Sequence, residues 1–156
     1  MHVIRALALL VVSFVLAGTA LAASSSQAVV KVRTTSLGKI LVAANGNSLY
    51  MFAKDKASQS SCYGNCEKFW PPYLTAGSPK AGSGVTKAWL GVIHRSDGAN
   101  QVTYRTHPLY FFAKDATAGQ TGGEGVAAFG AKWFALSSSG TKVTPPSSGG
   151  GGYGYH

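Results

Sequence analysis

The sequence has few acidic residues and no block of consecutive basic ones. Five Asp and Glu residues face 14 Lys and Arg residues, so the formal net charge is +9. Such a charge suits an anionic partner such as an envelope polymer, a phospholipid surface or extracellular nucleic acid, but because the positive charges are scattered we favour simple solubility as its role. Because no basic run forms a binding strip, we do not expect specific recognition of nucleic acid.

The sequence also lacks an apolar run long enough to cross a membrane. Residues 6–17 are almost wholly apolar, follow Arg5 and precede the small residues Ala20 and Ala22. At 1.5 Å per residue this run cannot span about 30 Å of hydrocarbon. The three-part pattern is typical of a secretory signal peptide over residues 1–22. We expect export to the periplasm or beyond the cell, and no lipid anchor, because no cysteine follows the apolar run.

Cysteine is nearly absent, since Cys62 and Cys66 are the only two. In an exported chain such a pair favours a disulfide. In the chain-entropy model, closing five residues contributes only about 2 kcal/mol, so the bridge would pin a loop. The spacing differs from a thioredoxin-like motif, and Glu67 stands where a c-type haem motif needs His. A zinc site would require His94 and His107, whose spacing fits no common zinc pattern.

One phrase occurs twice. Residues 49–55 and 109–115 agree at six of seven positions, with Met51 replaced by Phe111. The repeated-motif residues are Tyr50, Phe52 and Asp55 in the first copy and Tyr110, Phe112 and Asp115 in the second. Each copy predicts a pleated strand that is apolar on both faces and therefore lies inside a sandwich or barrel. The repetition indicates two related units.

Turn signals divide the rest of the chain into strands. In the first unit, about 34–77, the Asn45-Gly46 turn predicts a hairpin of residues 40–42 with 49–52. Residues 23–33 are a spacer with a candidate edge strand at 28–32. In the second unit, about 85–140, a three-strand meander precedes a final strand. The meander comprises residues 89–94, 101–104 and 109–112, and the final strand residues 132–136.

The remaining segments are short. Residues 67–70 predict one helical turn near the cysteine pair, ended by Pro71 and Pro72. The Gly/Ser/Pro-rich residues 141–156 are expected to be disordered. The fold expected is all-β: two related hairpin or meander units form one small sandwich or barrel. Its core would include the repeated aromatic residues and Trp70, Trp89 and Trp133.

No local pattern marks a reactive site. Asp55 could cap its own turn or act as a metal ligand or base, and we favour the cap. Turn or surface roles are favoured for His94 and His107 over metal or acid–base roles. No Ser-His-Asp or Cys-His grouping is visible locally, although such groups assemble in space. We therefore predict no catalytic residue, cofactor or metal site.

The Tyr-x-aromatic-x-x-Asp phrase resembles the hallmark of a family of bacterial secreted repeat proteins, often labelled predicted lipoproteins of unknown function. Other segments are similar to that family as well: residues 37–42, 62–66 with 70–72, 95–98 leading to Tyr104, and 130–133. The resemblance covers about residues 34–139. It implies an exported protein and supplies no activity and no catalytic residues. The lipoprotein label does not carry over, since the lipidation cysteine is missing.

Two functional hypotheses follow. The first is an exported cell-envelope or extracellular module, binding or structural rather than enzymatic, whose partner is an anionic polymer or another envelope protein. The alternative is a periplasmic metal- or redox-linked protein that uses the cysteines or the residues Asp55, Asp115, His94 and His107. A hydrolase has no sequence signature here, and the oligomeric state is not predicted.

Overall fold

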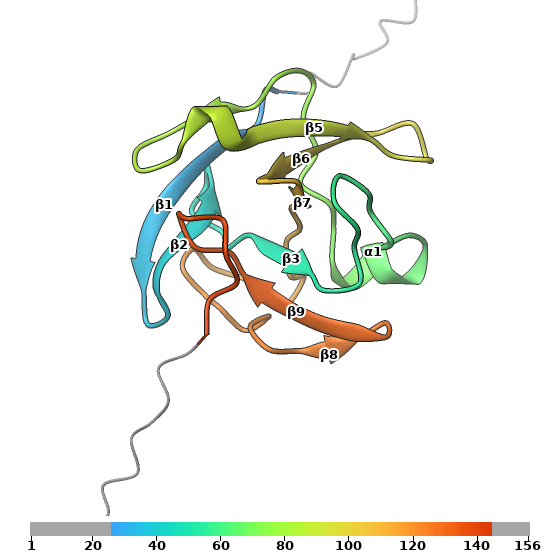
Figure 1. The fold of residues 1–156 in the computed structure, drawn as a ribbon. Coiled ribbons are helices and arrows are strands. Elements are labelled where there is room, and N and C mark those ends of the chain that lie inside the picture. The colour runs from blue at the N-terminus through green and yellow to red at the C-terminus, as the bar shows by residue number, and fades with distance from the viewer. Residues whose placement is uncertain (1–25, 145–156) are drawn as a thin grey trace, which may run out of the picture.

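The computed structural model describes residues 26–144 (Figure 1). The predicted signal peptide and residues 145–156 of the predicted tail lie outside the described residues. The described part consists of three small three-stranded sheets, one short helix and one 3-10 turn. The expected all-β fold is confirmed. No helix in this part of the chain is long and apolar enough to cross a membrane.

The first sheet has the order β2-β1-β4. The strands β1 (Val29–Thr35) and β2 (Gly38–Ala43) form an antiparallel hairpin that the sequence did not predict, and β4 (Lys80–Ala81) pairs with β1 in parallel. The candidate edge strand of residues 28–32 is therefore corrected: it belongs to a strand with a neighbour on each side. A parallel partner about 50 positions away leaves no local signal, because nearby turn residues cannot specify it.

The other two sheets follow the predicted pattern more closely. β5 (Leu90–His94), β6 (Asn100–Tyr104) and β7 (His107–Pro108) form the antiparallel meander of the second unit. β9 (Ala131–Ala135), the predicted final strand, lies between β3 (Tyr50–Phe52) and β8 (Ala127–Ala128). The predicted hairpin at Asn45-Gly46 is reduced to a bridge between Val42 and Ser48, with bonds from Ala43 N–H to Asn47 O at 2.9 Å and from Leu49 N–H to Leu41 O at 3.0 Å.

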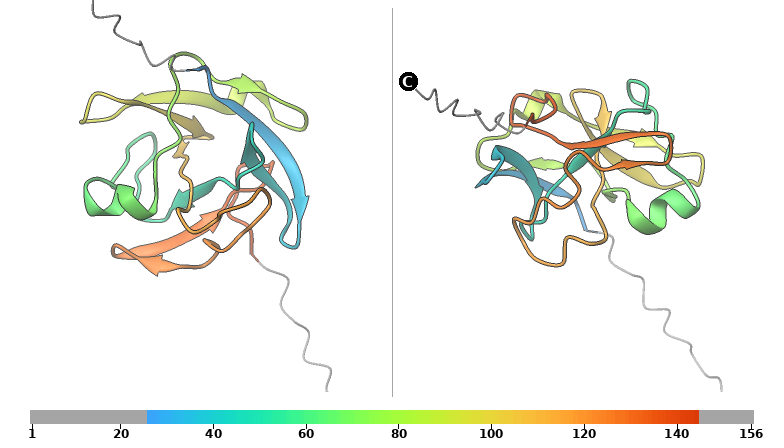
Figure 2. Two further views of the ribbon diagram at one scale, coloured as in Figure 1. Left: turned by 180° about the vertical axis from the view of Figure 1, so that it is seen from behind. Right: turned by 90° about the horizontal axis from the view of Figure 1, so that it is seen from below.

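The single helix, α1 (Asn65–Phe69), carries Cys66 and ends before the predicted prolines, while the 3-10 turn η1 (Lys87–Trp89) leads into β5. Figure 1 shows β5–β6–β7 at the top, β1 and β2 at the left, and β3, β9 and β8 below. In both views of Figure 2, α1 lies at the outer edge of this arrangement. The helix is thus placed beside the strands rather than among them.

The two copies of the repeated phrase are neighbours. Tyr50 N–H donates to Tyr110 O at 2.9 Å, and Tyr110 N–H donates to Tyr50 O at 3.0 Å. The segment that closes each unit pairs with the phrase of the other unit. Phe52 lies opposite Trp133 in β9, and residues on either side of Phe112 bond to the segment around Trp70: Phe111 N–H to Pro71 O at 2.8 Å, and Ala113 N–H to Phe69 O at 2.9 Å. The units are therefore interlocked and share one interior.

Four rings form a stack along this pseudo-twofold contact. The order is Phe52, Trp133, Trp70 and Phe112, with successive centroid distances of 4.0, 3.9 and 4.4 Å. Phe52, Trp133 and Trp70 are at most 1 % exposed, whereas Phe112 is half-buried. Trp89, expected in the core, is half-buried at its margin. Large aromatic side chains contribute most of the apolar area that such a small body can bury.

Candidate functional site

The side chains of the repeated motif contact one another across the two units. The Tyr50 hydroxyl donates to Asp115 Oδ2 at 2.5 Å, and the Tyr110 hydroxyl donates to Asp55 Oδ2 at 2.7 Å. Each Tyr ring also lies edge-on to a stacked tryptophan. Both tyrosines are fully buried. Each repeat therefore supplies the donor for the acceptor of the other.

Each aspartate also holds its own loop. Asp55 Oδ1 accepts from Ser61 N–H at 2.7 Å, and Asp115 Oδ1 accepts from Gly122 N–H at 2.9 Å. Asp55 therefore has the loop contact expected of a cap. Gly123 lies directly against Tyr50, where a Cβ atom would come within 2.8 Å of the ring. The loop after Asp115 can thus close over the tyrosine only because this position has no side chain.

The pKa shifts of the two Tyr–Asp pairs favour a structural role over a catalytic one. Burial raises the pKa of Tyr50 and of Tyr110 far above the ordinary tyrosine value, and the neighbouring aspartate reinforces the shift in each case. Burial also raises the pKa of Asp55, although the hydrogen bond from Tyr110 opposes this. Both phenols remain protonated donors near neutral pH. The four polar groups act as a bridge between the repeats.

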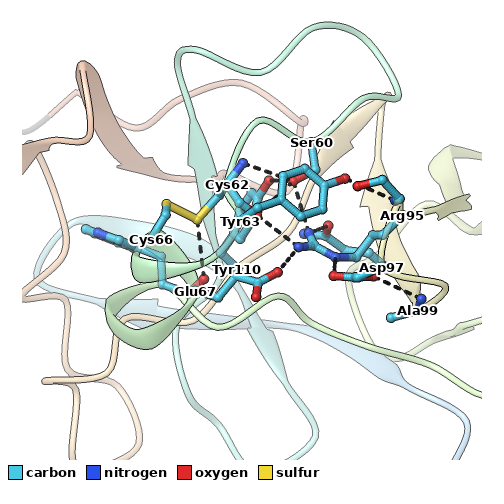
Figure 3. Close-up of polar contacts among 12 residues, drawn as sticks. Ser60, Cys62, Tyr63, Cys66, Glu67, Arg95, Asp97, Ala99 and Tyr110 are labelled. Atoms are coloured by element: carbon cyan, nitrogen blue, oxygen red, sulfur yellow. Dashed lines mark hydrogen bonds and ion pairs between the residues drawn. A yellow bond between two sulfur atoms is a disulfide. The ribbon is translucent and has the colours of Figure 1, made fainter.

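Arg95 is a buried hub beside the disulfide, and the sequence reasoning did not assign it a role (Figure 3). Its side chain is wholly unexposed and pairs with Glu67 and Asp97. It also donates to Cys62 O at 2.9 Å and to Ser60 Oγ at 3.0 Å. In the sequence, Arg95 stood out only as part of residues 95–98, one of the segments that resemble the secreted repeat family.

The hub connects to the repeated motif. Ser60 Oγ lies 2.8 Å from the Tyr110 hydroxyl, and Arg95 also donates to Gln101 Oε1 at 2.7 Å. The disulfide joins Cys62 to Cys66 and anchors α1 to the loop that Arg95 holds. A guanidinium group with its donors satisfied in several directions fixes local geometry. The loop from Asp55 to α1 is held by covalent, ionic and hydrogen-bonded contacts together.

The residues of the metal or redox alternative do not converge. Within residues 26–144, no three His, Cys, Asp or Glu side chains are placed to hold one ion. Asp55 and Asp115 each bind a tyrosine, and both cysteines are in the disulfide. His94 is exposed, whereas His107 is half-buried. Burial, with the charge of Arg105, lowers the pKa of His107.

The non-glycine residues with positive φ line two surface cavities. Four non-glycine residues among those described have positive φ: Ser58 at 56°, Arg105 at 46°, Thr106 at 71° and Phe129 at 57°. The first three line a cavity of about 530 Å³, and Phe129 lines a second cavity of about 260 Å³. Left-handed conformations are unfavourable for such side chains and recur at binding sites. These two cavities are therefore candidate binding sites.

The geometry defines a protein of two interlocked β repeats with a shared aromatic core. The family model described as a secreted repeat of unknown function matches residues 31–73 and 91–137, one segment in each unit. The chain belongs to this family, so the resemblance inferred from the repeated phrase is confirmed. It is an exported protein, and its family does not define a role. No curated protein and no solved structure was found to match the chain.

Proposed function

We propose that this protein is a non-enzymatic binding module of the cell envelope or the extracellular space, and that it binds an anionic polymer through its surface cations. One observation carries the proposal. All five carboxylates of the chain make internal contacts: Asp55, Glu67, Asp97, Asp115 and Glu124. Arg95 is the only Lys or Arg within residues 26–144 that contacts any of them. The surface cations therefore form no salt bridge within the described residues, which favours an anionic partner.

Arg105 is a cation held at a cavity by several contacts. Its guanidinium lies 4.2 Å from the centroid of the Trp89 ring, and Nη1 donates to Ser139 O at 2.9 Å. Its stem packs on Gly140, where a Cβ atom would lie 2.3 Å from Arg105 Cδ. A guanidinium held in this way loses little freedom on binding, and its fork matches a carboxylate or a phosphate.

The cavity beside Arg105 suits a hydroxyl-rich anion. Its lining includes the hydroxyl-bearing residues Ser58, Thr103 and Thr106. Gly91 also lines the cavity and leaves the Thr103 hydroxyl uncovered, because a Cβ atom at Gly91 would come within 2.8 Å of Thr103 Oγ1. We propose that the acidic group of the polymer pairs with Arg105 and that its neighbouring hydroxyls bond to this lining. The protein would act in the periplasm or outside the cell without a lipid anchor.

The test is binding to three purified polyanions: a poly(glycerol phosphate), a polyuronate and lipopolysaccharide. Affinity should fall steeply between low and high salt, because exposed charges are screened beyond a Debye length of about 8 Å at physiological ionic strength. Arg105→Gln should weaken binding several-fold more than Arg33→Gln, a control that removes the same charge from an exposed strand position. Salt-independent binding, or equal effects of the two variants, would contradict the proposal.

The same preparation tests the metal or redox alternative. The binding proposal predicts that exported protein carries no stoichiometric metal and no free thiol, consistent with the disulfide between Cys62 and Cys66. Elemental analysis and a thiol count measure both quantities. Bound metal at one equivalent, or two reactive thiols, would favour the alternative instead.

A further inference from the structure

A groove beside α1 exposes two phenylalanine rings over an aromatic floor. Phe69 is 47 % exposed and Phe129 is 39 % exposed, and their ring centroids are 6.0 Å apart. The groove has a volume of about 260 Å³, and Trp70 and Phe112 line it between these two walls. Large apolar side chains gathered around a concave surface mark a binding site more often than isolated exposed ones do.

Phe129 has a left-handed backbone conformation that is unfavourable for a phenylalanine. Ala128 and Ala131 pair across a two-residue turn in which Phe129 has φ 57° and Gly130 has φ 93°. Such turns favour Asn or Gly at the first position, because both central residues need positive φ. A phenylalanine here gives the turn no backbone advantage, yet it sets an aromatic wall opposite Phe69. Backbone strain of this kind clusters at ligand-binding sites, which points to a use for the exposed ring.

The two halves of the duplicated core differ at this groove. Phe52 is 1 % exposed against Trp133. Its repeat equivalent, Phe112, stacks on Trp70 at 4.4 Å but is only half-buried and faces the groove. Structural demand alone would treat the two positions alike. The open face of Phe112 is therefore a property of one repeat only.

Positive charge lies at the edge of the groove. Lys114 lines the groove and also an adjoining cavity of about 520 Å³. Lys54, at the equivalent position of the first repeat, has its ammonium beside Gly130, 3.6 Å from where a Cβ atom would stand. Neither contacts a carboxylate within the described residues. Asp115, which lines the adjoining cavity with Lys114, is occupied by Tyr50 and Gly122.

We propose that this groove binds a single-chain anionic amphiphile, a medium-chain carboxylate. The acyl chain would lie between Phe69 and Phe129 on Trp70 and Phe112, and the carboxylate would pair with Lys114, with Lys54 nearby. The small volume fits one chain rather than two, and the unpaired lysines at the apolar groove select an anionic head over a neutral one. This site is separate from the cavity at Arg105, so it does not depend on binding of a polyanion.

The test is calorimetric titration of the purified chain with hexanoate, octanoate and decanoate below their micellar concentrations. Affinity should rise about fourfold for each methylene that enters the groove. Neutral 1-decanol should bind at least several-fold more weakly than decanoate. Lys114→Gln should remove that difference between decanoate and decanol. Affinity independent of chain length, or equal binding of the alcohol and the carboxylate, would overturn the proposal.

Phe129→Gly separates binding from folding. Glycine accepts the positive φ of this position, so the variant should keep or raise its melting temperature while decanoate affinity falls at least tenfold. Leu74→Ala is the matched control, because Leu74 is 45 % exposed and lies outside this groove. It should leave the affinity unchanged. Unaltered affinity of Phe129→Gly, or a lowered melting temperature, would overturn the proposal. Polyanion binding should not change in Phe129→Gly, which keeps this result distinct from the Arg105 test.

Discussion

The Tyr50 hydroxyl donates to Asp115 Oδ2 at 2.5 Å, although the two residues are 65 positions apart. In the reciprocal hydrogen bond, the Tyr110 hydroxyl of the second repeat donates to Asp55 of the first. Each copy of the phrase is thus incomplete without the other, since its donor and its acceptor both have their partners in the other copy. This exchange explains why a tyrosine and an aspartate recur at the same spacing in both copies.

Removal of one hydroxyl should measure the strength of the exchange. Tyr50→Phe leaves Asp115 without its phenol donor, so we expect a loss of about 1–3 kcal/mol in the free energy of unfolding. Tyr50→Ala also removes a buried ring and should lose about 3 kcal/mol or more. Urea unfolding measures both, with Tyr63→Phe as a control, since the exposed Tyr63 hydroxyl accepts only one long bond, from Ser96 N–H at 3.3 Å. The double variant Tyr50→Phe/Asp115→Asn should lose less than the two single losses added together. Strict additivity, or an unchanged melting temperature for Tyr50→Ala, would contradict this role.

Arg95 should tolerate no conservative replacement. Its guanidinium contacts two carboxylates, a carbonyl, a hydroxyl and an amide oxygen while its side chain is unexposed. Lysine presents one ammonium group and cannot reproduce that fork. We expect Arg95→Lys to lower the free energy of unfolding by about 3–5 kcal/mol, as for a broken buried ion pair. Exposed Arg33→Lys should stay within about 0.5 kcal/mol. A loss below about 1 kcal/mol for Arg95→Lys would show that the hub is dispensable.

Asp55 should make a recognisable contribution to the pH dependence of stability. Burial raises its pKa in the folded chain, whereas the unfolded chain ionises near the ordinary value of about 4. Just above that pH, the folded protein therefore binds more protons than the unfolded chain, and the free energy of unfolding must fall as the pH rises. The stabilising contribution of Asp55 is fully present below about pH 4, and it is lost as the pH rises through the raised pKa of Asp55 in the folded chain.

The variant Asp55→Asn isolates this contribution. Urea unfolding between about pH 3.5 and 5.5 should show a flatter decline of stability with pH than in the parent chain. The window excludes most of the effect of His107, whose lowered pKa acts with the opposite sign at higher pH. A decline that is unchanged or steeper in the variant would refute the assignment.

The disulfide should fasten a loop without being required for folding. Cys62 and Cys66 close a short loop around the start of α1. Removing both as Cys62→Ala/Cys66→Ala should lower stability by about 2 kcal/mol in the chain-entropy model. Amide exchange should accelerate in α1 while the repeated phrases remain protected. A double variant that does not fold would contradict this view of the bridge.

The local elements were accessible from the sequence to different degrees. The Asp97-Gly98 turn correctly predicted the β5–β6 hairpin, because glycine at positive φ is a local requirement. The β1–β2 hairpin was missed, since its turn at Gly38 lacks a strong dipeptide signal. The wall formed by Phe129 was also missed, because a phenylalanine in a left-handed turn contradicts local preference. Such departures from preference occur where tertiary contacts or function override it.

The site depended still more on the three-dimensional arrangement. The repeated tyrosines were expected in the core, and both are fully buried. The exchange of partners between Tyr50 and Asp115 had no sequence signal, because either aspartate could have capped its own repeat. Arg95 was overlooked for a similar reason: its contacts extend to Ser60, 35 positions away. Spacing along a chain says nothing about which distant side chain completes a hydrogen bond.

By itself, the sequence determined the duplication, the β character, the pairing of the two cysteines and membership of a secreted repeat family. The duplication, the β character and the cysteine pairing follow from composition, periodicity and the conformational limits of single residues, whereas the family membership follows from the resemblance of several spaced motifs. Only the tertiary structure decided that the repeats interlock, that each Asp and Glu side chain makes an internal contact and that an aromatic groove stays open beside Lys114. These properties arise from contacts between distant segments, whose energies depend on geometry that short-range preferences do not contain.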